Sequence, residues 1–294
     1  MVAAILPNMT RKRARTVTLR LMQELSRLQI DYYLPDTLRE AFPEPESGRF
    51  LPESALIPAC DIVLPVGGDG SVIRAAKTAA LADKPVLGVN AGNLAYLCAA
   101  DVMNDPGALD VLKTGEYGEQ TRMMLEVSVY EADRLLHRYL CLNDVAFARG
   151  RQLSLVTLSV RANGKPIADY VGDGLIFSTP TGSTAYNMAA GGPIVEPTLS
   201  AVLVTAICPH SLDFRPFLFA PDTVFEVRGR FRGQEEICFS CDGETNDVLT
   251  PSGLVVIRRA PTQVRLLTIN SDNFIDVLNQ KLRRAKQTAE KNGK

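Results

Sequence analysis

The chain has 294 residues, of which 46% are hydrophobic, enough for one large domain or two ordinary domains with a substantial core. Its 32 Lys and Arg residues balance 33 Asp and Glu residues, so the formal net charge is −1. No overall positive field therefore attracts nucleic acid or an anionic membrane, and we expect neither as a partner.

The amino-terminal segment contains a short apolar stretch, residues 2–6, which Pro7 interrupts. It lacks the basic start and the length of a signal peptide. No apolar stretch approaches the roughly 20 residues that a membrane-spanning helix requires. These features favour a cytoplasmic protein.

Six cysteines are spread along the chain, and only Cys238 and Cys241 form a C-x-x-C pair. They fall in a strand-like stretch, where side chains three residues apart point to opposite faces. We therefore expect buried, reduced thiols here and no zinc site.

Short apolar strands alternate with helical patterns over the first 90 residues. We predict strands at residues 3–6, 32–34, 62–66 and 85–89, helices at 11–28 and 72–81, and a loop at 42–58. This alternation is typical of parallel βαβ units in an open sheet. Ligands of such sheets bind at the carboxyl ends of the strands.

From about residue 121 the pattern changes to closely spaced strands. We predict them at 123–130, 135–142, 153–161, 165–170, 175–179, 202–208, 224–230, 237–241, 254–259 and 264–269, with helices at 184–190 and 274–287. Asn163-Gly164 indicates a hairpin turn. We expect an α/β domain at 1–115, an antiparallel β-sandwich at 116–268, and a helical segment at 269–294 that packs back on the first domain.

The first candidate site follows the strand at 62–66 and consists of Gly67, Gly68, Asp69, Gly70 and Ser71. Glycines let the backbone approach a ligand and adopt positive φ, and amides at a helix start suit phosphate groups. Ser71 can cap the following helix. An aspartate there repels phosphates unless it serves a metal ion or accepts a proton, which points to phosphoryl transfer. A tight structural turn explains the motif about equally well.

A second candidate site lies between an apolar strand and a glycine pair. Its hydroxyl residues are Ser178, Thr179, Thr181, Ser183 and Thr184. Hydroxyls and free amides before a helix supply many donors for a phosphate-bearing ligand. Tyr186 offers a face on which a heteroaromatic ring can stack. Asp173, between two glycines, offers an acceptor for sugar hydroxyls or a carboxamide.

Residues 172–197 closely resemble the NAD kinase family, whose pattern here reads D-G-L-I-x-S-T-P-T-G-S-T-A-Y-x-x-x-A-G-G-P-I. Further stretches resemble the family in the same order: 66–74, 88–94, 142–145, 208–212 with 215–216, and 241–243. The resemblance implies an N-terminal α/β domain, a C-terminal β-sandwich, and phosphoryl transfer from ATP or polyphosphate to the adenosine ribose 2′-hydroxyl of NAD. It also implies a homo-oligomer, a dimer or tetramer, with sites at subunit contacts.

The resemblance assigns Asp69 as the general base. Gly67, Gly68 and Gly70 would admit the donor phosphates, whose oxygens a divalent cation, Mg²⁺, would bridge, and no residue is assigned as a metal ligand. Arg74 either meets a phosphate or is an ordinary helix-surface arginine.

For NAD, the resemblance places Asn143 at the adenine, Asp144 at the ribose and Asp173 near the nicotinamide half. The other residues assigned to the site are Thr181, Ser183, Thr184, Ala185, Tyr186, Asn187, Ala189 and Glu244. Asp144 stands where the family usually has Glu, which withdraws the carboxylate by roughly 1.5 Å. Alternatively, Asp144 only closes the turn before Val145.

A second departure from the family pattern is Ala95-Tyr96 in place of Gly-Phe, which we interpret as a packing change. Two other functions stay open. Another kinase with the same glycine loop, acting on a lipid or sugar phosphate, would lack the segment 178–186. A non-catalytic NAD(P)-binding protein would not need Asp69. Neither the choice between ATP and polyphosphate nor the use of NADH follows from the sequence.

Overall fold

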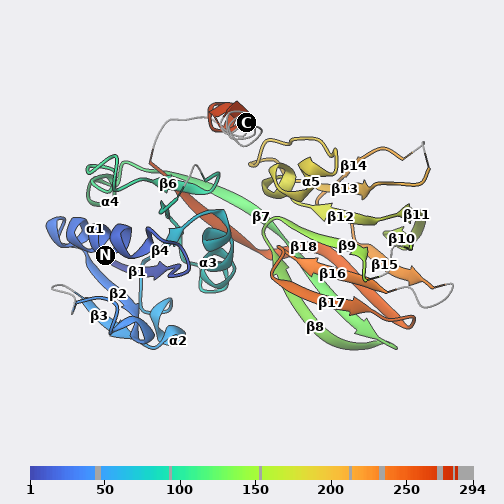
Figure 1. Ribbon diagram of the computed structural model, residues 1–294, viewed down its shortest axis with the longest axis horizontal. Helices are drawn as coiled ribbons and strands as arrows, with labels where there is room; N and C mark the ends of the chain where they lie inside the picture. The colour runs from blue at the N-terminus through green and yellow to red at the C-terminus, as the bar shows by residue number, and fades with distance from the viewer. Residues whose placement is uncertain are drawn as a thin grey trace. The chain divides into compact units, whose positions relative to one another are not determined.

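The computed structural model describes residues 1–43, 48–92, 95–151, 154–211, 214–231, 236–269, 274–280 and 282–283. The chain divides into two compact units, Met1–Thr121 with Val264–Lys294, and Arg122–Gln263. It passes from the first unit to the second within β7 (Gly118–Glu131) and returns within β18 (Gly253–Thr268) (Figure 1).

The first unit contains a six-stranded sheet of parallel strands in the order β3-β2-β1-β4-β5-β6. The strands are β1 (Val2–Pro7), β2 (Asp31–Pro35), β3 (Gly48–Leu51), β4 (Ile62–Gly67), β5 (Gly88–Asn90) and β6 (Cys98–Ala100). This confirms the predicted parallel α/β fold. The strand order reverses between β1 and β4, the point at which doubly wound sheets bind ligands.

Helices α1 (Ala14–Arg27) and α3 (Asp69–Leu81) connect these strands, with short helices α2 (Glu53–Leu56), η1 (Asp36–Leu38) and α4 (Val111–Thr114). On α1 the side chains of Val17, Leu21 and Leu25, spaced four residues apart, are buried in the core of the first unit. Strand β4 is buried along its whole length, as its continuous apolar sequence predicts.

The second unit contains two six-stranded sheets, in the orders β11-β10-β15-β18-β7-β8 and β14-β13-β12-β9-β16-β17. Besides β7 and β18, the strands are β8 (Arg134–Cys141), β9 (Asp144–Arg149), β10 (Val156–Ala162), β11 (Lys165–Gly172), β12 (Gly174–Ser178), β13 (Val202–Ile207), β14 (Phe217–Phe219), β15 (Phe225–Arg230), β16 (Ile237–Cys241) and β17 (Thr245–Leu249). Phe177 in β12 packs against Phe225 in β15, with ring centroids 5.1 Å apart. Side chains of both sheets thus form one core, which confirms the antiparallel sandwich.

The predicted hairpin at Asn163-Gly164 is also confirmed. Both residues have positive φ, 48° and 74°, and they join the antiparallel strands β10 and β11. In β16, Cys241 is buried and Cys238, on the opposite face, is half-buried, so the predicted divergence holds while full burial of both thiols does not.

Several predicted elements are wrong. The expected loop at 42–58 contains β3 and α2. The strand expected at 85–89 begins later, at Gly88, and ends at Asn90. The strands expected at 254–259 and 264–269 are one strand, β18. Pro261 lies within this strand but beyond residues 255–257, which pair with β15, and so it removes no hydrogen bond to β15.

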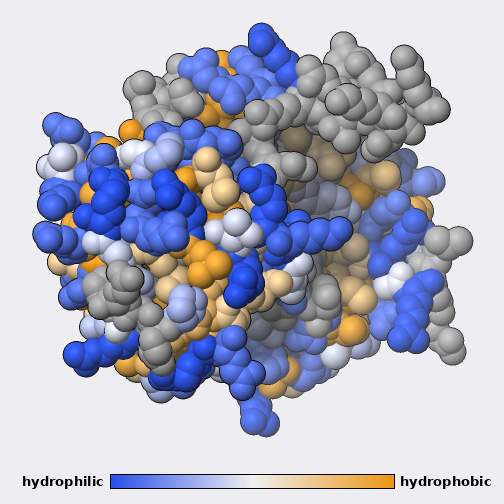
Figure 2. All heavy atoms as spheres, turned by 60° about the vertical axis from the view of Figure 1, so that its left-hand side comes forward, coloured by the Kyte–Doolittle hydropathy of each residue, from blue (hydrophilic) through white to orange (hydrophobic). Residues whose placement is uncertain are grey.

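Some predictions fall outside the described residues: Asn93 and Leu94, Leu212, and residues 284–287 of the C-terminal helix. In the described part of the chain, no helix has the length and apolar character needed to cross a membrane. Figure 2 shows hydrophilic side chains over much of the first unit's surface on the face turned forward.

Candidate active site

The glycine loop lies at the carboxyl end of β4, beside the end of β1. Strand β4 ends at Gly67, and α3 begins at Asp69 with Gly68 as its N-cap in an extended conformation. Two local expectations are wrong. None of Gly67, Gly68 and Gly70 has positive φ, and Ser71 lies inside the first turn without capping the helix.

Gly67 is required by close packing. A Cβ at this position would lie 2.1 Å from Ser71 Oγ, and that oxygen accepts a hydrogen bond from Asn8 Nδ2 at 3.1 Å. The Asn8 amide in turn donates to the Val66 carbonyl at 2.9 Å. Asn8 follows β1, so it ties together the two strand ends at the switch point. Asn8 has no local sequence signal, because the residues to which it bonds lie about 60 positions along the chain.

Gly68 and Gly70 have no such packing requirement, because no described atom lies within 4 Å of a Cβ built on either residue. Between them, the half-buried Asp69 carboxylate is anchored through Oδ1, which accepts the Leu97 amide hydrogen at 2.8 Å. The loop therefore combines a fixed carboxylate with backbone that a ligand can approach closely.

Tyr96 lies in the electrostatic field of Asp69. Burial of the phenol raises the pKa of Tyr96, and the negative charge of Asp69 raises it further. The residue expected to be only a packing change is therefore electrostatically coupled to the proposed base. Arg74 is exposed on α3, one turn after the exposed Gly70 and on the same face. This position is compatible with either interpretation of Arg74.

In the second unit, the turn before β9 is held by Asp242. Its Oδ2 accepts the Leu142 amide hydrogen at 3.0 Å, and its Oδ1 accepts the amide hydrogens of Asn143 and Asp144 at 2.8 and 3.1 Å. The residue that closes this turn is therefore Asp242, which the sequence analysis did not assign to the site.

The hydroxyl segment, residues 178–184, begins at the end of β12 and binds the same turn. Thr179 donates its amide hydrogen to the Asn143 carbonyl at 2.8 Å and its hydroxyl to the Leu142 carbonyl at 2.6 Å. Gly182 packs so closely that a Cβ would lie 2.2 Å from the Asn143 carbonyl oxygen. Three segments distant in sequence, 142–144, 178–182 and 241–243, thus form one site.

The Asp144 side chain is only 5% exposed, and within the described residues its carboxylate has no hydrogen bond or ion pair. Burial raises the pKa of Asp144 from 3.8 to about 7, and the charge of Asp242 contributes to the rise. The Asp144 side chain makes no hydrogen bond to the described backbone of this turn, so the ligand role and the turn-closing role both stay predictions. A buried carboxylate without a partner is available to a ligand.

The hydroxyl segment contains both structural and available groups. Ser183 Oγ bonds the amide and the carbonyl of Val195, at 3.0 and 3.1 Å. The fully buried Asn187 donates to two carbonyls and accepts from Thr205 Oγ1 at 2.7 Å. The fold occupies both of these side chains, and their contact with a ligand stays a prediction. Thr181 Oγ1 is buried without a partner and is available.

The more accessible positions lie at the end of the hydroxyl segment and directly after it. Tyr186 is 44% exposed, Ala189 is exposed, and Thr184 and Ala185 are half-buried. Glu244 lies exposed in the turn that contains Asp242. Their availability agrees with the predicted contacts without testing them.

Asp173 is not brought to this site. It precedes β12, whereas the hydroxyl segment follows β12, so about 17 Å separate Asp173 from Ser178 along an extended strand. Its carboxylate pairs with Arg149, with Nε and Oδ1 3.3 Å apart.

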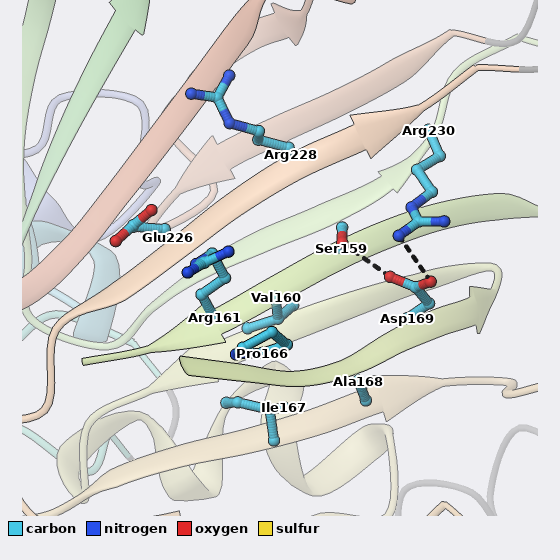
Figure 3. A pocket seen from close by; sticks show the side chains of 10 residues that line it. All are labelled: Ser159, Val160, Arg161, Pro166, Ile167, Ala168, Asp169, Glu226, Arg228 and Arg230. Atoms are coloured by element: carbon cyan, nitrogen blue, oxygen red, sulfur yellow. Dashed lines mark hydrogen bonds and ion pairs between the residues drawn. The ribbon is translucent and has the colours of Figure 1, made fainter. Parts of the chain in front are cut away.

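Elsewhere in the second unit, the outer face of β10, β11 and β15 has a hollow of about 590 Å³ that includes Arg161, Arg228 and Arg230 (Figure 3). Asp169 binds Ser159 and Arg230 there. None of the predicted site residues lines this hollow. Over the described part of the chain, no three His, Cys, Asp or Glu side chains are grouped to hold a metal ion.

A fixed carboxylate in a glycine loop at a helix start, together with a sandwich domain that carries a second polar loop, defines the chain as a phosphotransferase of the kinase type. The family model of the ATP-NAD kinase N-terminal domain matches residues 4–117, and that of the ATP-NAD kinase C-terminal domain matches residues 142–269. The chain therefore belongs to the NAD kinase family.

Individual relatives agree. The chain is 30% identical to an NAD kinase of Thermoanaerobacter sp. (strain X514) over 95% of this chain and 97% of the relative. It is 38% identical to an NAD kinase of Symbiobacterium thermophilum over 79% and 81%. Yeast NADH kinase, solved with NADH, shares the fold with a TM-score of 0.86, 21% identity, and coverage of 96% of this chain and 87% of that one. An Archaeoglobus fulgidus NAD kinase, solved with ATP, has a TM-score of 0.69 and 22% identity, with coverage of 96% of this chain and 99% of that one.

The space beside Gly70 leads to a first prediction. Gly70→Ala places a methyl group where the protein has no atom, and alanine favours a helix over glycine by about 0.5–1 kcal/mol. We expect unchanged or higher thermal stability but at least tenfold slower phosphoryl transfer, because the methyl group obstructs donor phosphates. Gly107→Ala, which meets only ordinary contacts in a loop of the same unit, is the control. Unchanged kinetics in Gly70→Ala would contradict close phosphate approach.

A second prediction concerns the stability of the ligand-free protein. The pKa of Asp144 is about 7 in the folded chain against 3.8 ordinarily, so the folded state retains this proton longer than the unfolded chain. Stability from this group is complete below pH 4 and is lost as the pH rises to about 7. The side chain in Asp144→Asn is always neutral. The free energy of unfolding of this variant should therefore exceed that of the wild type over this range, by up to about 4 kcal/mol.

Urea unfolding of both proteins between pH 4 and 8 measures this difference. Asp169→Asn removes an exposed carboxylate of the same unit and serves as the control. A stability difference between Asp144→Asn and wild type that stays constant with pH would contradict the raised pKa.

Proposed function

We propose that this chain transfers a phosphoryl group from ATP to the 2′-hydroxyl of the adenosine ribose of NAD, with Asp69 as the general base. The observation that carries the proposal is the anchored Asp69 carboxylate between two glycines whose surroundings are open to a ligand. A ribose hydroxyl is a weak nucleophile at neutral pH, and a carboxylate within hydrogen-bond reach removes its proton as the new bond forms.

The donor phosphates would lie against the backbone at Gly68 and Gly70. The start of α3 directs amide groups and the positive end of the helix dipole toward that position. Phosphoryl transfer depends on alignment and charge neutralisation more than on covalent help from the protein. Arg74, on the same face of α3 as Gly70, would supply positive charge to the phosphate chain.

A divalent cation, Mg²⁺, fits this site. Magnesium in kinase sites is held by one or two carboxylates, by waters and by the substrate's phosphates. With Asp69 kept as the base, waters and the donor phosphates beside the start of α3 would supply the ligands of the cation, and a site of this kind needs no three-residue cluster. When bound, the cation would neutralise charge on the donor phosphates.

NAD would bind the second unit through its adenosine. The half-buried Asn143 would meet the adenine, and the unpartnered carboxylate of Asp144 and hydroxyl of Thr181 would accept or donate hydrogen bonds. Tyr186 would stack on a ring. The family models named for ATP and NAD, and the Archaeoglobus relative solved with ATP, support these substrates. A panel of donors including polyphosphate, and of acceptors including NADH, would define the range.

We also propose a homo-oligomer, to which the position of Asp173 adds support. Within one chain Asp173 is separated from the hydroxyl segment by the length of β12. It would serve NAD bound at a subunit contact more readily than NAD bound by the hydroxyl segment of its own chain. Mixing an Asp69 variant with an Asp173 variant and recovering activity would support this arrangement.

The central test is Asp69→Asn, which keeps the side-chain shape but cannot take up a proton. The wild type with NAD, ATP and Mg²⁺ should produce NADP, and the variant should be slower by about 10²–10⁴-fold. NAD affinity, measured by calorimetry, should be retained. A variant with near wild-type turnover would remove Asp69 from the role of base, and a wild type that makes no NADP would overturn the proposed function.

Tyr186→Ala tests the placement of NAD. Loss of the ring contact should weaken NAD binding by about 1–2 kcal/mol and leave the ATP affinity much less changed. Phe217→Ala, which removes a ring of similar exposure (45%) from β14 of the same unit, is the control. If ATP affinity falls while NAD affinity holds, the two nucleotides have been assigned to the wrong sites.

A further inference from the structure

Asp242 occupies a turn whose backbone is shaped to direct its carboxylate. It follows β16 and has φ 52°, and Gly243 after it has φ 68°. Aspartate and asparagine are the non-glycine residues that adopt this left-handed conformation most readily. The Asp242 amide donates to the Asp144 carbonyl at 2.9 Å, so both the backbone and the side chain of Asp242 bind the turn before β9.

The carboxylate of Asp242 accepts three consecutive amide hydrogens, at distances of 2.8–3.1 Å. Hydrogen bonds to an ionised acceptor are stronger than neutral ones. Amides of adjacent residues converge on one anion only if the backbone between them is held in a fixed curve. That curve sets the direction in which the side chains of Asn143 and Asp144 leave the chain.

We propose that Asp242 is a positioning residue of the NAD site, which fixes the turn that presents Asn143 and Asp144 to the adenosine. The inference rests on the proposed function, because the substrate is assigned there. Asp242 has no role in that mechanism, and it acts through the two residues it holds.

The charge of Asp242 gives this role a second effect. The described titratable groups on the segments around Asp144 are Asp242, the exposed Glu244, and the buried thiols of Cys141 and Cys241. Of these, Asp242 acts together with burial to raise the pKa of Asp144. An ionised carboxylate accepts a ribose hydroxyl better than a neutral one, so NAD affinity should rise with pH through the pKa of Asp144.

The test compares Asp242→Asn and Asp242→Glu with wild type. Asparagine retains the preference for the left-handed turn but has one acceptor oxygen, so at least one amide loses its partner. We expect NAD affinity to fall about tenfold, ATP affinity to change less than twofold, and the midpoint of the pH dependence of NAD affinity to move to lower pH. Asp242→Glu keeps the charge and displaces it, so NAD affinity should fall with the midpoint near that of the wild type.

Asp169→Asn is the matched control, since it also removes a carboxylate that bonds neighbours in the same unit. Unchanged NAD affinity in both Asp242 variants, an equal loss in the control, or a midpoint that does not move in Asp242→Asn would each overturn the proposal.

Hydrogen exchange of the 142–144 amides in the ligand-free proteins separates this inference from the proposed function. Faster exchange in both Asp242 variants, and not in Asp169→Asn, supports the role of Asp242 in holding this turn even if the wild type makes no NADP. Unchanged exchange in the Asp242 variants contradicts that role even if the wild type makes NADP.

Discussion

All six backbone polar groups of residues 142–144 are bonded to two other segments of the chain. The three amides donate to the Asp242 carboxylate, the carbonyls of Leu142 and Asn143 accept from Thr179, and the Asp144 carbonyl accepts from the Asp242 amide. Buried backbone groups must find such partners. Because every partner comes from outside the turn, the side chains of Asn143 and Asp144 are not needed to bond the backbone of the turn. The second unit's site depends on this arrangement.

Each unit holds a polar loop in place, and the two units do so by different interactions. In the first, Gly67, Ser71 and Asn8 pack tightly beneath the loop, and the positions facing outward carry no side chains. In the second, hydroxyl and amide side chains such as Ser183 and Asn187 form the support. Among the described residues, the buried Thr181 Oγ1 is then left without a hydrogen-bond partner.

Sequence predicted the features that depend on neighbours in the chain. A buried strand ending in glycines at 67 and 68 and an Asn-Gly hairpin are local signals, and the structure has both. Strand β9 was missed because it begins and ends with a charged residue, Asp144 and Arg149, which leaves a run of only four apolar residues between them. Asp242 and Asn8 were missed because their partners lie about 100 and 60 residues away, distances over which no periodicity carries information.

The first unit is completed by the end of the chain. The Val86 amide donates to the Arg265 carbonyl at 2.8 Å, the Leu267 amide donates to the Val86 carbonyl at 2.9 Å, and Leu267 belongs to that unit's core. During synthesis the first 121 residues therefore leave the ribosome without a strand that their own fold requires. They must wait, incompletely closed, until the whole sandwich has been translated, and a fragment ending at residue 121 would keep that gap permanently.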